Sequence, residues 1–212
     1  MLSDARVDIA VLVSGGGTNL QALLDAQASG ALRSGRVALV VSDREGAYAL
    51  ERARNAGVEA RCLSRRGQSQ AEWEKRLAAL LDSRGVGLVV LAGFLTLLGA
   101  AFIGAFRGRL VNVHPSLVPA FCGKGYYGLR VHEAALARGV RVTGATVHLV
   151  DEVPDGGPIL LQKAVRVRRG DTPQSLQKRV MERAEWVLLP RACETLCKKL
   201  LKEGCGHARN AL

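Results

Sequence analysis

The sequence predicts a single-domain α/β protein with a doubly wound, mostly parallel sheet flanked by helices, and with antiparallel strands near its C-terminal end. Three observations support this prediction. Short apolar runs typical of buried strands alternate with segments of helical apolar spacing through residues 8–114. A run of three glycines joins the first strand to the first helix. The segment DEVPDGGP between the last two strand-like runs is too short for a helical crossover, so those strands should be antiparallel neighbours.

The predicted strands are short and rich in Val, Leu and Ile, as expected for strands that are buried on both faces. The first, DIAVLV, passes directly into the glycines. The fifth, LVNVH, is ended by Pro115, which cannot donate a hydrogen bond to a neighbouring strand. Right-handed crossovers through the intervening helices would make the first five strands parallel. The predicted strands are 8–13, 36–42, 58–63, 87–92, 110–114, 141–150 and 159–167.

Helices are predicted between these strands from apolar residues at helical spacing. In one of them Trp73, Leu77 and Leu81 fall on one face. The last helix, 172–202, contains Pro190, which is expected to kink or divide it. The other predicted helices lie within 18–26, 47–55, 93–106 and 129–138.

Composition indicates a cytoplasmic protein with no membrane partner. No run of eighteen apolar residues occurs, and Asp4, Arg6 and Asp8 stand where a secretory signal would need an apolar stretch. The five cysteines are an odd number and are scattered along the chain, which favours free thiols over a disulfide framework.

The formal net charge of +11 suits the capture of anions, either nucleic acid or small molecules. Charge alone does not choose between them. The basic residues of the C-terminal part are spread along an amphipathic helical pattern, which favours a solvated face. Aromatic residues make up only 4% of the chain, which is few for a platform that stacks bases. We therefore expect small-molecule partners and no nucleic acid.

The segment SGGGTN after the first strand is a candidate phosphate-binding loop. Glycines let the backbone turn tightly and expose its amides, and the N-terminus of the following helix favours an anion. Gly15, Gly16 and Gly17 would supply the amides, while Thr18 and Asn19 would add side-chain donors and cap the helix.

Two other interpretations of this loop fail on its residues. A dinucleotide-binding loop is disfavoured because Leu20 occupies the third glycine position of G-x-G-x-x-G, and no acidic residue follows at the usual offset of about twenty residues. A P-loop is excluded because no Gly-Lys-Ser/Thr follows. A monophosphate therefore suits the loop better than NAD. A third interpretation stays open, in which the glycines only let the helix pack closely against the strand.

A second candidate site lies at the end of the predicted strand 110–114. Side chains alternate along a strand, so Asn112 and His114 project to one face, at the carboxyl end where open α/β sheets bind ligands. Asp155, followed by two glycines, would place a carboxylate beside the imidazole. Its charge would orient His114 and raise its pKa, so that the cation could donate to an oxyanion, with Asn112 as a second donor. The alternative that this is a polar pair satisfied by backbone stays open.

No metal is expected. Cys193, Cys197, Cys205 and His207 carry ligand atoms, but their spacing matches no standard zinc pattern.

These motifs resemble the glycinamide ribonucleotide formyltransferases, enzymes of purine synthesis that use 10-formyltetrahydrofolate. The resemblance spans nearly the whole chain, through VLVSGGGTNLQALLDA, SDREGAYALERA, LVVLAGFLTLLG, VNVHPSLVPAFCGKG and VTGATVHLVDEVPDGGPILLQ. The NxHPSLxP and DxG patterns belong to the wider formyltransferase group, and SGGGTN narrows the resemblance to the ribonucleotide branch. It implies one Rossmann-like domain, 1–212, with an acceptor-phosphate half at about 1–105 and a folate and catalytic half at about 106–212.

The resemblance also implies roles for particular residues. Asn112, His114 and Asp155 would be the catalytic trio. The acceptor phosphate and ribose would be held by Gly15, Gly16, Gly17, Thr18, Asn19, Pro115 and Glu185. The folate would be enclosed by Leu91, Phe94, Leu97, Leu98, Val150, Asp151, Glu152 and Val153, while Thr146 and His148 would lie near the site.

The resemblance further implies that the peptide bond between Val118 and Pro119 is cis. At two positions the chain departs from many members of that family. Thr96 stands where they have a basic residue, and Trp186 follows Glu185 where they have histidine.

The expected reaction is direct transfer of the formyl group from 10-formyltetrahydrofolate to the amine of glycinamide ribonucleotide, without a metal, in a monomer or homodimer. Three alternatives are another folate-dependent formyltransferase, a formyl-folate hydrolase and a non-catalytic sensor of nucleotide phosphates.

Overall fold

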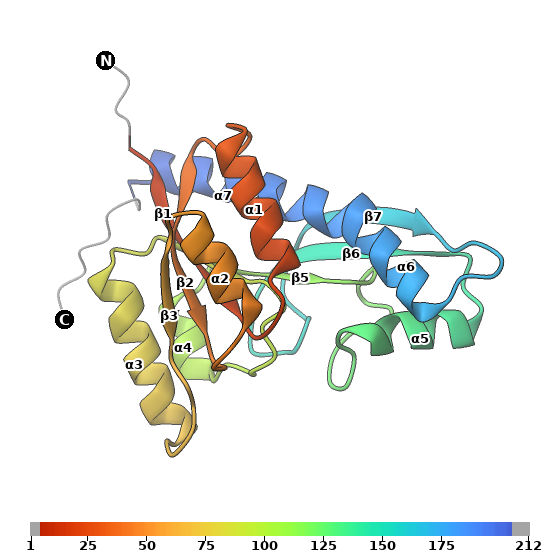
Figure 1. Ribbon diagram of the computed structural model, residues 1–212, viewed down its shortest axis with the longest axis horizontal. Coiled ribbons are helices and arrows are strands. Elements are labelled where there is room, and N and C mark those ends of the chain that lie inside the picture. Colours follow the sequence, from red (N-terminus) through yellow and green to blue (C-terminus); the bar gives the residue numbers. More distant parts are fainter. Residues whose placement is uncertain (1–4, 205–212) are drawn as a thin grey trace.

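The computed structural model describes residues 5–204 and confirms the predicted α/β architecture (Figure 1). Its strands form one sheet in the order β3-β2-β1-β4-β5-β6-β7. Neighbours from β3 to β5 are parallel, whereas β6 is antiparallel to both β5 and β7, as the short connection before β7 predicted. The strands are β1 (Val7–Val13), β2 (Gly35–Ser42), β3 (Glu59–Cys62), β4 (Leu88–Leu91), β5 (Leu110–His114), β6 (Val142–Leu149) and β7 (Ile159–Arg166).

Helices cover both faces of this sheet, so its central strands are buried on two sides. The first helical layer contains α1, α2, α6 and α7, and the second contains α3 and α4. The helices are α1 (Thr18–Ala28), α2 (Tyr48–Asn55), α3 (Gln70–Ser83), α4 (Ala100–Ala105), α5 (Leu129–Arg138), α6 (Pro173–Val180) and α7 (Trp186–Lys202), with a π-helical turn η1 (Met181–Glu185) between the last two.

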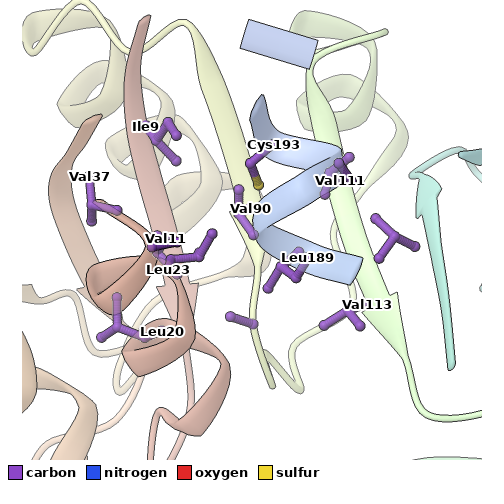
Figure 2. Close-up of a cluster of buried hydrophobic side chains, with 14 of the residues drawn as sticks. Ile9, Val11, Leu20, Leu23, Val37, Val90, Val111, Val113, Leu189 and Cys193 are labelled. Atoms are coloured by element: carbon purple, nitrogen blue, oxygen red, sulfur yellow. The ribbon is translucent and has the colours of Figure 1, made fainter. Parts of the chain in front are cut away.

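The core has two layers because alternate residues of each strand face opposite sides. On β1, Val11 belongs to the cluster under α1 and α7, while Leu12 belongs to the cluster under α3 and α4. Figure 2 shows the first cluster, in which Leu23 of α1 and Leu189 of α7 pack against side chains of β1, β2, β4 and β5. This packing holds the strands whose ends carry the candidate sites.

The order of the sheet reverses at β1. The chain runs outward from β1 through β2 to β3, and then returns to the other side of β1 to form β4 and β5. Connections therefore leave the neighbouring carboxyl ends of β1 and β4 in opposite directions, an arrangement that creates a crevice for ligands. Both candidate sites lie at this edge, because one follows β1 and the other ends β5.

Of the two outcomes expected at Pro190, a kink or a division of the last helix, the division is wrong. Helix α7 runs through Pro190, and the break lies earlier, at η1. Pro190 has no N–H for the carbonyl of Trp186, four residues before it, and its ring crowds that carbonyl. The π-helical hydrogen bonding of η1 ends just before Trp186, and α7 then continues as an α-helix to Lys202.

Among residues 5–204, no helix has the length and apolar character needed to cross a membrane.

Candidate active site

Strand β5 places two polar side chains on one face of the sheet. Its valines face the core beneath α7, so Asn112 and His114 point the other way, as predicted. In the antiparallel register with β6, Asn112 lies opposite His148 and His114 lies opposite Thr146. The structure therefore brings both residues that were expected near the site directly beside the pair on β5.

Asp155 completes this group from the connection between β6 and β7. Its Oδ2 lies 3.4 Å from Nδ1 of His114, and its Oδ1 lies 3.5 Å from Nε2 of His148. The backbone N–H of Gly123 donates to Oδ2 at 2.8 Å, and Nδ2 of Asn112 donates to Oδ1 at 3.3 Å. The predicted trio is thus assembled around one carboxylate.

The backbone around Asp155 has little freedom. A Cβ at Gly157 would lie 2.0 Å from the carbonyl oxygen of Leu149, so only glycine fits there. Among residues 5–204, Asp155 (φ 56°) and Phe121 (φ 51°) are the non-glycine residues with positive φ. Both contact His114, because Nε2 of its ring lies 2.9 Å from the Phe121 carbonyl oxygen. Uncommon backbone conformations of this kind persist where the surrounding structure holds them, often at functional sites.

The predicted rise in the pKa of His114 is wrong in direction. Burial lowers the pKa of His114 below its usual value, and this effect exceeds the opposing influence of the Asp155 charge and of the Phe121 carbonyl. Burial also acts to raise the pKa of Asp155, but the hydrogen bond with His148, the His114 ring and the Gly123 N–H together lower it. Both ring nitrogens of His114 face acceptors, Nε2 the Phe121 carbonyl and Nδ1 the Asp155 carboxylate, while burial acts against the charged ring.

His148 fixes the orientation of Asn112. Its Nδ1 lies 2.9 Å from the carbonyl oxygen of Leu149, which requires a proton on Nδ1. Its Nε2 lies 3.2 Å from Nδ2 of Asn112 and 3.5 Å from Oδ1 of Asp155. Nδ2 of Asn112 also donates to that Oδ1, at 3.3 Å. The amide of Asn112 is thus held between His148 and Asp155.

Thr146 supports the segment that follows His114. Its hydroxyl donates to the carbonyl oxygen of Ser116 at 2.7 Å and accepts from the N–H of Val118 at 3.0 Å. Nε2 of Gln162 also donates to it at 3.0 Å. The Val118-Pro119 bond is cis, as predicted. Thr146 therefore acts on the site through the backbone beyond β5.

A cavity of about 780 Å³ opens above the trio. The loop 123–128 forms part of its wall, as the sequence predicted for the segment after Pro119. All eight residues expected around the folate line it, together with the trio, Pro115 and His148. Its size and its apolar wall suit a ring system of folate dimensions. The lining residues from the expected folate set are Leu91, Phe94, Leu97, Leu98, Val150, Asp151, Glu152 and Val153.

The glycine loop lies outside the lining of this cavity and is held by α2. The Ala49 N–H donates to the carbonyl of Gly15 at 3.0 Å, and Nε of Arg52 donates to that of Gly16 at 2.8 Å. Because the N–H and C=O of one peptide unit point in opposite directions, the N–H groups of Gly16 and Gly17 are turned away from these partners. Gly15 and Gly16 are exposed, and a Cβ at either would meet nothing within 4 Å, so neither packs against another element.

Gly17, with φ 72°, is the N-cap of α1, and no side chain caps this helix. The expectation that Thr18 and Asn19 cap the helix is therefore wrong. Asn19 is instead drawn into the core, where its Nδ2 donates to Oε2 of Glu185 at 2.7 Å. Burial raises the pKa of Glu185 to about 7, and the bond from Asn19 only partly opposes this. Glu185 ends the π-helical turn, so the break in the last helix places it beside the loop.

One buried titratable group near the site was missed. His132 on α5 is fully buried, and neither ring nitrogen has a hydrogen-bond partner. Burial, assisted by nearby His114, lowers the pKa of His132 to about 4. A signal was present in the sequence, because Val131 and Ala135 on either side of it mark the inward face of the helix.

Within residues 5–204, no group of three or more His, Cys, Asp or Glu side chains could hold a metal ion. Cys193 and Cys197 are buried in the core under α7. Cys205 and His207 lie outside the described residues.

A doubly wound sheet, a cavity at its carboxyl edge and an Asn–His–Asp cluster in that cavity are the features of an α/β enzyme that acts on a small molecule. The chain belongs to the formyl transferase family, whose model matches residues 7–192.

Individual relatives agree with this assignment. The chain is 39% identical over 175 residues to a phosphoribosylglycinamide formyltransferase of Escherichia coli, covering 82% of this chain and 80% of that protein. It is 38% identical over 199 residues to a chloroplastic protein of the same name from Arabidopsis thaliana, covering 93% and 68%. It is 36% identical over 200 residues, 94% of its length, to the human trifunctional purine biosynthetic protein adenosine-3, but spans only 19% of that protein.

Solved structures show the same fold. A glycinamide ribonucleotide transformylase from Symbiobacterium toebii has a TM-score of 0.86 and 43% identity, covering 92% of this chain and 89% of that one. A formyltetrahydrofolate deformylase from Burkholderia mallei has a TM-score of 0.81 but only 26% identity, covering 92% of this chain and 66% of that one. The resemblance is therefore stronger to the transformylase than to the hydrolase.

Proposed function

We propose that this protein transfers the formyl group of 10-formyltetrahydrofolate to the amine of glycinamide ribonucleotide, giving N-formylglycinamide ribonucleotide and tetrahydrofolate in purine biosynthesis. One observation carries the proposal: a cavity over Asn112, His114 and Asp155 lies at the same sheet edge as a separate glycine loop. Two substrates of different chemistry, one of them a phosphate ester, can thus approach one reactive centre.

The acceptor binds along the glycine loop. The backbone N–H groups of Gly16 and Gly17, with Gly15, Thr18 and Asn19, hold its phosphate at the N-terminus of α1. Glu185, next to Asn19, receives its ribose hydroxyls. A carboxyl with a pKa of about 7 can accept from a hydroxyl or donate to one, which suits this role. Pro115 lines the path from the loop to the trio.

The folate occupies the cavity and supplies the formyl group. Asn112 and His114 stabilise the negative oxygen that develops as the neutral amine attacks the formyl carbon. Burial lowers the pKa of His114, and Asp155, 3.4 Å from its Nδ1, stabilises the imidazolium that forms when the ring accepts a proton from the attacking nitrogen. His114, assisted by water, returns this proton to the folate nitrogen as the bond from that nitrogen to the formyl carbon breaks. No side chain becomes acylated.

Residues 1–105 and 106–212 divide these tasks only roughly, as the acceptor-phosphate half and the folate and catalytic half. We place the enzyme in the cytoplasm, acting on small molecules as a monomer or homodimer. Free thiols among the described cysteines agree with that compartment.

A single assay separates the proposal from its alternatives. Tetrahydrofolate formation is followed with and without glycinamide ribonucleotide. A transferase forms it only with the ribonucleotide present, a hydrolase forms it in either case, and a sensor of nucleotide phosphates forms it in neither. Failure of glycinamide ribonucleotide, together with success of another amine, would indicate a different folate-dependent formyltransferase.

A further inference from the structure

Gln162 on the edge strand β7 lies in line with two residues of the site. In the registers of the sheet, His114 of β5 lies opposite Thr146 of β6, and Thr146 lies opposite Gln162. Side chains that stand directly opposite each other across antiparallel strands share one face of the sheet. The three residues therefore form one row, which runs from the reactive histidine to the edge of the sheet.

The turn that follows β5 lies over this row. A Cβ at Gly144, two residues before Thr146, would lie 2.9 Å from Cδ2 of Leu117, so the turn rests directly on β6. Nε2 of Gln162 donates to the carbonyl oxygen of Val118 at 3.0 Å and to the hydroxyl of Thr146 at 3.0 Å. Gln162 is an exposed residue, yet its amide thus ties the turn to the edge strand.

The same turn carries a direct partner of the reactive histidine. Beyond Val118, the carbonyl oxygen of Phe121 lies 2.9 Å from Nε2 of His114. Further along, the N–H of Gly123 donates to Oδ2 of Asp155, which faces the other ring nitrogen. A displaced turn would therefore withdraw the partner of one ring nitrogen and a support for the partner of the other.

We propose that Gln162 is a positioning residue for His114, because it holds the turn 116–121 against the sheet. Gln162 lies outside the lining of the cavity, so it acts through the turn and not on a bound molecule. Its effect on turnover rests on the proposed function, whereas its effect on the ring of His114 does not.

The titration of His114 reports on this arrangement. Burial lowers the pKa of His114, and the contact with the Phe121 carbonyl is one of two influences that oppose this lowering. Substitution of Gln162 leaves every charged or titratable neighbour of the ring in the protein, so a change in the titration would come from the turn. These neighbours are Asp155 from the β6–β7 connection, His148 on β6 and His132 on α5.

The test compares the unaltered protein with Gln162→Met, which keeps an unbranched side chain but removes the donor. Gln174→Met, at an exposed position of α6, is the matched control. The pKa of His114 is measured by NMR in the protein without substrates, and a His114→Asn variant identifies its resonance. We expect Gln162→Met to lower this pKa further, because the ring loses the Phe121 carbonyl that favours its protonated form. The control should titrate as the unaltered protein does.

Kinetics provide the second readout. We expect kcat of Gln162→Met to fall about threefold to tenfold, the net effect of one hydrogen bond, with KM for both substrates unchanged. Because the substituted side chain is exposed, the variant should fold as the unaltered protein does.

An unchanged titration of His114 in Gln162→Met would overturn the proposal, as would an equal change in the control. A rise in KM at unchanged kcat would also overturn it, because Gln162 would then serve substrate binding. A lowered pKa of His114 in a protein that transfers no formyl group would contradict the proposed function but support the positioning role.

Discussion

Nδ2 of Asn19 donates a hydrogen bond of 2.7 Å to Oε2 of Glu185, although 166 residues separate them in the chain. The bond is buried and joins the glycine loop after β1 to the π-helical turn before α7. It fixes the position of the proposed phosphate site relative to the proposed ribose site. Its carboxyl partner has a pKa of about 7, so the state of this link changes within the physiological pH range.

Glu185→Gln is expected to remove a pH-dependent loss of stability. The pKa of Glu185 is raised by burial from 4.5 to about 7 in the folded protein. The folded state therefore binds the proton more tightly than the unfolded state, and the stability that this proton contributes is lost as pH rises from about 4.5 through 7. At pH 8 the glutamine variant should be about 1–3 kcal/mol more stable than the unaltered protein, and at pH 5 the difference should shrink.

Urea unfolding at both pH values measures this difference. In the same variant KM for glycinamide ribonucleotide should rise, because the proposed ribose contact loses its charge. A glutamine variant that is less stable at pH 8 than at pH 5, relative to the unaltered protein, would contradict the assigned pKa.

Asp155→Asn should lower kcat by about 10²–10⁴, the usual contribution of acid–base support. Asparagine tolerates the positive φ of this position, so the backbone should keep its shape. The variant lacks the charge that balances an imidazolium at His114, whereas KM for the acceptor should change little because the phosphate loop is separate. Asp25→Asn, exposed on α1, is the control. Near-normal kcat with weak folate binding would instead make Asp155 a residue that only shapes the loop.

Thr146→Val should cost about 1–3 kcal/mol of stability and also lower kcat. The substitution keeps the shape of the side chain but removes the acceptor of the Val118 N–H and the donor to the Ser116 carbonyl, both in the segment after His114. Thr143→Val is a close control, because Thr143 lies buried on the same strand and its hydroxyl has no hydrogen-bond partner. Chemical denaturation should show the control as neutral or stabilised. Equal losses in the two variants would refute a positioning role for Thr146.

His132 should make the protein sensitive to acid. The pKa of His132 is about 4 in the folded state, below its ordinary value of 6.5, because the ring is buried without partners. The unfolded state binds the proton more readily, so stability is lost as pH falls from about 6.5 to 4. His132→Leu should remove about 1–3 kcal/mol of this loss, measured as the difference in unfolding free energy between pH 7 and pH 4.5. An unchanged pH dependence in the leucine variant would assign the acid sensitivity to other groups.

The sequence by itself determined the alternation of strands and helices, the turn at Gly17 and the shared face of Asn112 and His114. These features depend on periodicity and on residues with restricted or unusual backbone freedom, which act over a few neighbouring positions. It also indicated the family, and with it a set of cavity-lining residues that the structure brings together. Tertiary structure decided what depends on distance and burial.

The contact of Asp155 with His114 requires the β6–β7 register and a positive φ. The lowered pKa of His114 follows from burial that outweighs a nearby charge. Asn19 donates to Glu185 and does not cap α1. This partner is available only because α7 packs against α1 and because η1, which ends at Glu185, directly precedes α7. These outcomes are sums of opposing energies set by groups far apart in the chain, and no local pattern contains them.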